Sequence, residues 1–128
     1  MPRPIFTLLS GPRVLGECVL AGFDEGMGVA LGPFRPAAAY EEVRSVFRAF
    51  AELDPGAAAQ GAEHARLREF YRRRDELRLE LVDAAGRVLP TGWIMVYDFS
   101  AEAGEDGYEW DAQITDPEFR GGRTGLAK

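Results

Sequence analysis

The sequence contains one cysteine (Cys18), one histidine (His64) and one lysine (Lys128) among its 128 residues. One cysteine excludes an internal disulfide, and small secreted domains are usually cross-linked, so we expect a reducing, cytoplasmic location. One cysteine and one histidine also cannot complete a closed zinc site. No apolar run approaches the ~20 residues of a membrane helix, and the apolar stretch at residues 5–9 is too short for a secretory signal.

Motifs of nucleophilic catalysis and of nucleotide binding are also missing. No serine stands in a Gly-x-Ser-x-Gly elbow. Cys18 falls on the apolar side of a predicted strand, where a thiol is usually a buried hydrophobe. The glycines at Gly26 and Gly28 precede a predicted strand rather than a helix, so they do not form a phosphate-binding loop. The sequence therefore favours a protein that is not an enzyme and that uses no cofactor, and its motifs indicate no family.

Basic residues are absent between Arg87 and Arg120, a stretch that holds eight acidic residues. Six of the fourteen arginines lie instead between Arg66 and Arg78, and we interpret this segment as a helix whose arginines pair with its own acidic residues. The net charge is −6. Because nucleic-acid binders present a basic face to phosphates, this balance argues against a nucleic-acid partner.

The sequence does contain enough apolar residues, 46%, for one globular domain, and their spacing predicts an α+β fold. The order βββ-αα-βββ predicts two antiparallel three-stranded segments that form one or two sheets packed against two helices. The predicted strands are residues 5–9, 14–20, 29–34, 77–82, 88–99 (with an interruption at 90–92) and 108–114, and the predicted helices are residues 37–53 and 62–75.

The first predicted helix has the clearest apolar stripe. Tyr40, Val43, Phe47 and Phe50 recur at spacings of three and four, which places them on one side of a helix. We expect this side to face the core. Residues 1–116 are predicted to form the domain, and the glycine-rich residues 117–128, which lack periodicity, are predicted to form a flexible tail.

The acidic segment carries our functional hypothesis. Strand alternation places Glu109 and Asp111 on the opposite side of the last strand from Trp110, next to a loop that holds further carboxylates. A concentrated acidic surface attracts a basic protein partner and raises its rate of encounter. A solvated acidic face without a role explains the same residues. We interpret the protein as a non-enzymatic interaction or accessory module, of the immunity-protein or inhibitor type, whose partner-binding residues are Glu102, Glu105, Asp106, Glu109 and Asp111.

The alternative is a small enzyme or ligand-binding domain that uses carboxylates of the same region. In that case a divalent cation would be held by Asp98, Glu109 and Asp111. The loop at residues 100–107, between the two strands that carry them, lacks the regular spacing of a calcium-binding motif. The two hypotheses predict different surfaces. A deep pocket that combines any of these carboxylates with Trp93, Tyr97 or Trp110 favours the alternative, and a flat or convex acidic face favours the interaction module.

Replacing Phe47 by Ala tests the apolar stripe. A fully buried Phe at this position should lower the free energy of unfolding by about 3–5 kcal/mol when it is truncated to Ala, as measured by urea denaturation. A loss of less than about 1 kcal/mol would instead place the side chain at a partly exposed site.

Overall fold

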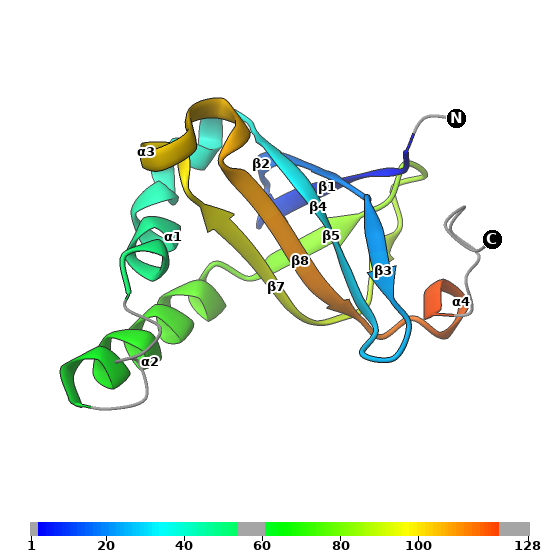
Figure 1. Ribbon diagram of the computed structural model, residues 1–128. Coiled ribbons are helices and arrows are strands. Elements are labelled where there is room, and N and C mark those ends of the chain that lie inside the picture. The colour runs from blue at the N-terminus through cyan, green and yellow to red at the C-terminus, as the bar shows by residue number, and fades with distance from the viewer. Residues whose placement is uncertain (1–2, 54–60, 121–128) are drawn as a thin grey trace.

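The computed structural model describes residues 3–53 and 61–120. Strands occupy the middle of the molecule, helices α1, α2 and α3 gather at one side of it, and α4 lies at the other side (Figure 1). The strands are β1 (Ile5–Ser10), β2 (Arg13–Val19), β3 (Gly22–Asp24), β4 (Val29–Pro36), β5 (Leu79–Val82), β6 (Val88–Leu89), β7 (Thr91–Asp98) and β8 (Tyr108–Ile114). The helices are α1 (Arg44–Ala51), α2 (Gly61–Glu76), α3 (Ser100–Ala103) and α4 (Pro117–Arg120), with short 3₁₀ turns η1 (Ala38–Glu42) and η2 (Gly104–Asp106).

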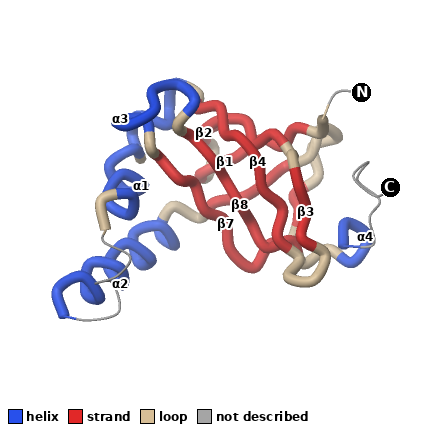
Figure 2. Tube along the Cα trace, in the orientation of Figure 1, coloured by secondary structure: helices blue, strands red, loops and turns tan. Residues whose placement is uncertain are grey.

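The strands form one antiparallel sheet in the order β6-β5-β1-β2-β4-β8-β7, and β3 pairs with β4 outside this order. Pro90 alone separates β6 from β7, yet β6 pairs with β5 at one end of the order and β7 pairs with β8 at the other. Proline has no N–H to donate to a ladder, so a break between two partners is a suitable place for it. The β6–β7 segment therefore links both ends of the order, and the sheet curls into a near-barrel (Figure 2).

The structure confirms the α+β class and the antiparallel sheet, with eight strands in place of the six expected. The predicted order βββ-αα-βββ is compatible with this sheet if β2 and β3 are counted as one interrupted strand, and β6 and β7 as another. The predicted loop at 100–107 instead contains the short turns α3 and η2.

The first predicted helix, residues 37–53, is interrupted at Val43. Residues before Val43 form η1, and α1 begins only at Arg44, because Val43 has non-helical backbone angles of φ −119° and ψ 0°. Side chains three residues apart share a side in both helix types, so the spacing of Tyr40 and Val43 does not distinguish them. The second predicted helix, residues 62–75, agrees within one residue at each end with α2.

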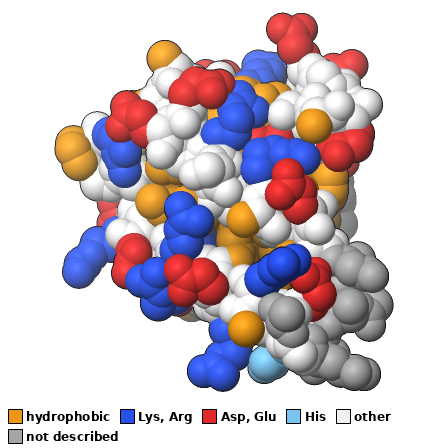
Figure 3. Space-filling model, turned by 90° about the vertical axis from the view of Figure 1, so that its left-hand side faces the viewer, with side chains coloured by type: hydrophobic (Ala, Val, Ile, Leu, Met, Phe, Trp, Pro, Cys, Tyr) orange, Lys and Arg blue, Asp and Glu red, His pale blue; other side chains and the backbone are white. Residues whose placement is uncertain are grey.

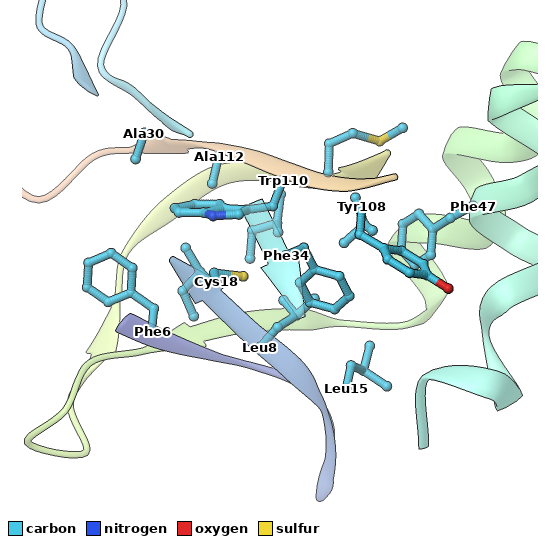
Figure 4. Close-up of a cluster of buried hydrophobic side chains, with 14 of the residues drawn as sticks. Phe6, Leu8, Leu15, Cys18, Ala30, Phe34, Phe47, Tyr108, Trp110 and Ala112 are labelled. Atoms are coloured by element: carbon cyan, nitrogen blue, oxygen red, sulfur yellow. The ribbon is translucent and has the colours of Figure 1, made fainter. Parts of the chain in front are cut away.

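Most of the core lies inside the curled sheet, where Phe6, Leu8, Cys18 and Trp110 face one another (Figure 4). The indole Nε1 of Trp110 donates to the backbone carbonyl of Val19 at 2.9 Å, which joins β8 to β2 through the interior.

The apolar stripe of the first helix joins the same core. Tyr40, Val43 and Phe47 are at most 2% exposed, which confirms their predicted direction, whereas Phe50 is only partly buried. The rings of Tyr40 and Phe47 are stacked with their centroids 6.1 Å apart. These aromatic contacts continue to Phe70 of α2 and so hold both helices to the sheet.

The segment after β8 differs from the predicted tail. Phe119 of α4 is 4% exposed, and its ring lies 5.9 Å from that of Phe6 and 5.0 Å from that of Phe23. A single aromatic residue in a stretch without periodicity gives no pattern from which burial can be predicted. Residues 121–128, the rest of the predicted tail, lie outside the described residues.

Replacing Phe119 by Ala should therefore destabilise the domain. Loss of its contacts with Phe6 and Phe23 should cost about 3 kcal/mol in the free energy of unfolding, measured by urea denaturation. Phe99→Ala is the matched control, because Phe99 is 39% exposed and its truncation should cost less than about 1 kcal/mol. Equal and small losses for both variants would show that α4 does not contribute to stability.

Candidate functional site

Asp98, at the end of β7, is fully buried and is held by three different segments. One carboxylate oxygen accepts hydrogen bonds from the hydroxyl of Tyr40 at 2.7 Å and from Nη1 of Arg44 at 3.1 Å. The other accepts from the backbone N–H of Ser100 at 3.0 Å and from its hydroxyl at 2.6 Å. Both oxygens of Asp98 are thus used in holding η1, α1 and α3 to the sheet.

The ionised form of Asp98 is stabilised in this site. Burial by itself would raise the pKa of the carboxyl, but the hydrogen bonds from Ser100 and Tyr40 and the charge of Arg44 outweigh it and lower the pKa. Asp98 therefore acts as a structural anchor.

The alternative metal set of Asp98, Glu109 and Asp111 is divided between two faces of the sheet. Asp98 is opposite Tyr108 on the inner face, whereas Glu109 and Asp111 alternate with Tyr108 and point outward. Among the described residues, no cluster of three or more histidine, cysteine or acidic side chains could hold a metal ion. The structure thus brings only two of these three carboxylates together.

The outer face of β4, β8 and β7 carries two rows of side chains set by the strand register. Asp111 lies between Leu31 and Met95. In the next row Glu109 lies between Pro33 and Tyr97. The hydroxyl of Tyr97 reaches diagonally to both carboxylate oxygens of Asp111, each at 3.1 Å. Acidic side chains of β8 are therefore flanked on both sides by apolar or aromatic ones.

These rows border a hollow of about 380 Å³, which we call the acidic groove. Burial raises the pKa of Asp111; the hydrogen bond from Tyr97 opposes this increase, and the charge of Glu109 adds to it. The ionised carboxylate is therefore poorly stabilised by its present surroundings. The lining residues are Leu31, Gly32, Pro33, Tyr97, Asp106, Tyr108, Glu109, Trp110 and Asp111.

Acidic residues elsewhere are mostly matched with arginines. Basic and acidic side chains are interspersed on the face that carries the helices (Figure 3), and Arg72 of α2 pairs with both Glu69 and Glu76. These pairs confirm the predicted pairing within the arginine-rich helix. By contrast, no basic residue of the described chain pairs with four acidic residues in or next to the groove: Glu105, Asp106, Glu109 and Asp111.

The five predicted partner-binding residues are only partly brought together. Asp106, Glu109 and Asp111 line the groove. Glu105 is exposed on η2 without lining it, and Glu102 on α3 is paired with Arg48, with 3.3 Å between Oε1 and Nη1. The acidic surface is thus a groove that includes the side chain of Tyr97, and this feature was expected of the ligand-binding alternative, whereas the side chain of Trp110 points into the core.

Sequence reasoning missed the apolar wall of the groove. Leu31 and Pro33 are exposed on the outer face of β4, and their alternation with Ala30 and Phe34 is visible in the sequence. The missing information was the pairing of β4 with β8, two strands that are far apart in the chain.

The thiol of Cys18 is not a candidate nucleophile. Cys18 is fully buried, and burial raises the pKa of its thiol, so the thiol stays protonated and is a poor nucleophile. No helix in the described parts of the chain has both the length and the apolar composition needed to cross a bilayer.

Comparisons with models of protein families, with curated proteins and with solved structures found no match to this chain.

Replacing Asp98 by Asn tests its role as an anchor. Because folding lowers its pKa below the ordinary value of 3.8, ionised Asp98 stabilises the fold above that value, and the stabilisation is lost as the pH falls through the folded-state pKa. We expect Asp98→Asn to cost about 1–3 kcal/mol at neutral pH, and to make urea stability less dependent on pH between about pH 5 and about pH 2.

Asp111→Asn is the matched control for this prediction. Folding raises the pKa of Asp111, so its ionisation costs stability as the pH rises, and the asparagine variant should be at least as stable as the unmodified protein at neutral pH. Parallel pH profiles for Asp98→Asn and the unmodified protein would contradict the lowered pKa of Asp98.

Proposed function

We propose that the protein is a non-enzymatic interaction module that binds a basic segment of a partner protein in the acidic groove. The observation that carries this proposal is that the groove carboxylates pair with no basic side chain of residues 3–53 and 61–120, whereas most other acidic side chains in these ranges are paired. A surface on which like charges are left together costs stability. A partner that supplies the missing cation removes this cost.

The groove suits an arginine side chain of the partner. A guanidinium donates several parallel hydrogen bonds and matches carboxylates such as Asp111 and Glu109. Its apolar stem would pack on Leu31, Pro33 and the ring of Tyr97, which border the same hollow. The raised pKa of Asp111 supports this arrangement, because an incoming cation would stabilise the carboxylate that burial disfavours.

The exposed acids around the groove add a longer-range attraction. Glu105 and Asp106 are exposed on η2 at the end of the groove. Their charges would draw a basic partner toward the groove and increase its association rate, an effect that salt weakens. The same charges repel nucleic acid. The single cysteine supports a reducing, cytoplasmic location for this interaction.

The ligand-binding alternative is favoured by one specific observation. A carboxyl whose pKa is raised by burial, as in Asp111, is the type of group that serves as a general acid, and Tyr97 lies within hydrogen-bond distance of it. In this alternative the groove would bind a small cationic molecule rather than a segment of a protein.

A titration with a tetra-arginine peptide, followed by amide chemical shifts, tests the proposal. We expect saturable shifts of residues around Tyr97, Glu109 and Asp111 and none with a tetra-glutamate peptide. The double reversal Asp106→Lys/Glu109→Lys should weaken binding by at least about tenfold, because each lost charge-assisted contact is worth about 1.5–3 kcal/mol.

The matched control is Glu25→Lys/Glu80→Lys, which changes the net charge equally. Glu25 and Glu80 are exposed and lie outside the groove, so this variant should retain most of the binding. Equal losses in both double variants would show a nonspecific charge effect and overturn the proposal. Binding of argininamide alone as tight as that of the peptide would favour the small-ligand alternative.

A further inference from the structure

A second hollow, which we call the aromatic pocket, lies on the other side of Tyr97 from the acidic groove. It measures about 380 Å³ and opens between β7 and the two helices α1 and α2. Met95 of β7 is 3% exposed, so this outward-facing side chain is covered by the pocket walls rather than by solvent. The lining residues are Phe50, Tyr71, Arg74, Trp93, Met95 and Tyr97.

The walls of the pocket are aromatic rings held in place by one another. The ring of Phe50 lies 5.9 Å from that of Tyr97 and 5.0 Å from that of Phe70, which in turn lies 5.5 Å from Tyr71. Such fixed edges and faces favour insertion of a further flat ring, and aromatic pairs gain about 0.5–1.5 kcal/mol beyond the area they bury.

The charge of the pocket is positive. Arg74 is the only charged residue among the described residues that line it, and the guanidinium carbon lies 4.9 Å from the centre of the Tyr71 ring. The Arg74 side chain is only 16% exposed. Its Nη2 contacts Oδ1 of Asp75 at 3.3 Å, and among the described residues the guanidinium donates to no other acceptor, so its remaining donors are available.

A smaller hollow of about 220 Å³ adjoins this pocket and shares Arg74 and Trp93 with it. It adds two charged residues: Asp75, which is already paired with Arg74, and Arg78, which has no ion-pair partner among the described residues. The backbone of Arg78 is in the left-handed region at φ +52°. Arg78 is the second residue after the end of α2, a position where glycine is the usual occupant of this conformation. An arginine there carries conformational strain and places a second guanidinium beside the pocket.

We propose that the aromatic pocket binds a planar aromatic molecule that carries an anionic group, such as a carboxylate. The ring would enter between Tyr97, Phe50 and Trp93, and the anionic group would accept hydrogen bonds from Arg74 and Arg78. Guanidinium groups recognise carboxylates through paired hydrogen bonds. The volume lies within the range of ligand pockets, which begins at about 300 Å³.

An organic cation does not fit this pocket. Aromatic cages bind quaternary ammonium groups, but Arg74 already places its charge over the Tyr71 ring. None of the described residues that line the aromatic pocket is a carboxylate, and Asp75 of the adjoining hollow is already paired with Arg74, so a second cation would not be compensated. The site is independent of the acidic groove, since Tyr97 is the one residue that the two hollows share among the described parts of the chain, and the charged residues that line them have opposite sign.

Three naphthalene derivatives of similar size test the proposal: naphthoate, naphthalenemethanol and naphthylmethylammonium. Each is titrated into the full chain, and the Trp93 indole N–H resonance, assigned with Trp93→Phe, reports occupancy. We expect naphthoate to bind more tightly than the alcohol and the cation to bind most weakly. Arg74→Gln should weaken naphthoate binding by about tenfold or more and change binding of the alcohol little. Arg68→Gln, which removes an exposed charge of the same helix outside the pocket, should change neither.

Arg78→Gly separates the role of this side chain in binding from its effect on the fold. Glycine adopts the left-handed conformation without strain, so this variant should have a higher thermal midpoint and yet bind naphthoate more weakly. Arg78→Gly also tests the role of the arginines in naphthoate binding if Arg74→Gln does not fold. Failure of naphthoate to bind the folded protein at millimolar concentration would overturn the proposal, as would equal binding of the ammonium compound or shifts that map away from Trp93.

Discussion

The buried carboxylate of Asp98 is the constraint on which the arrangement of the helices depends. Strand alternation directs this side chain inward with Ile94 and Val96, and an unpaired carboxylate in that position would cost several kcal/mol. Tyr40, Arg44 and Ser100 therefore have to reach it, which brings η1, α1 and α3 to the end of β7. With the helices held at this edge (Figure 1), both hollows remain open on the outer face of the sheet.

The uneven distribution of charge along the chain becomes a separation of charge across Tyr97. Its hydroxyl is bound to Asp111 of β8, in the segment without basic residues, and its ring contacts Phe50 on the side where Arg74 of α2 lies. The ring of Tyr97 thus borders an acidic hollow and a basic one. A single ligand with separated charges has a defined orientation on such a surface, since reversing it would place like charges together.

Residue patterns predicted those features that depend on neighbours in the chain. Alternation separated Glu109 and Asp111 from Tyr108 and Trp110, and the helical spacing identified Tyr40, Val43 and Phe47 as core residues. Long-range pairing was inaccessible to this reasoning, because no local pattern indicates that β8 pairs with β4 and brings Leu31 beside Asp111. The alternation of Asp98 with Val96 was enough to predict that Asp98 points inward. No local pattern predicts that Tyr40, Arg44 and Ser100 bind its carboxylate. The backbone of Arg78 gave no signal, since arginine is not a residue that indicates left-handed geometry.

The order of strands in the sheet has a consequence for how the chain folds. β1 pairs with β5 and β4 pairs with β8, so both outer edges of the first three-stranded segment are completed by strands from the second half of the chain. Contacts between such distant segments require large loops to close before they contribute any stability, and folding rates fall as the share of these contacts rises. During synthesis on the ribosome, the first segment would therefore remain with exposed strand edges until β8 has emerged, and this interval is when the chain is most exposed to aggregation.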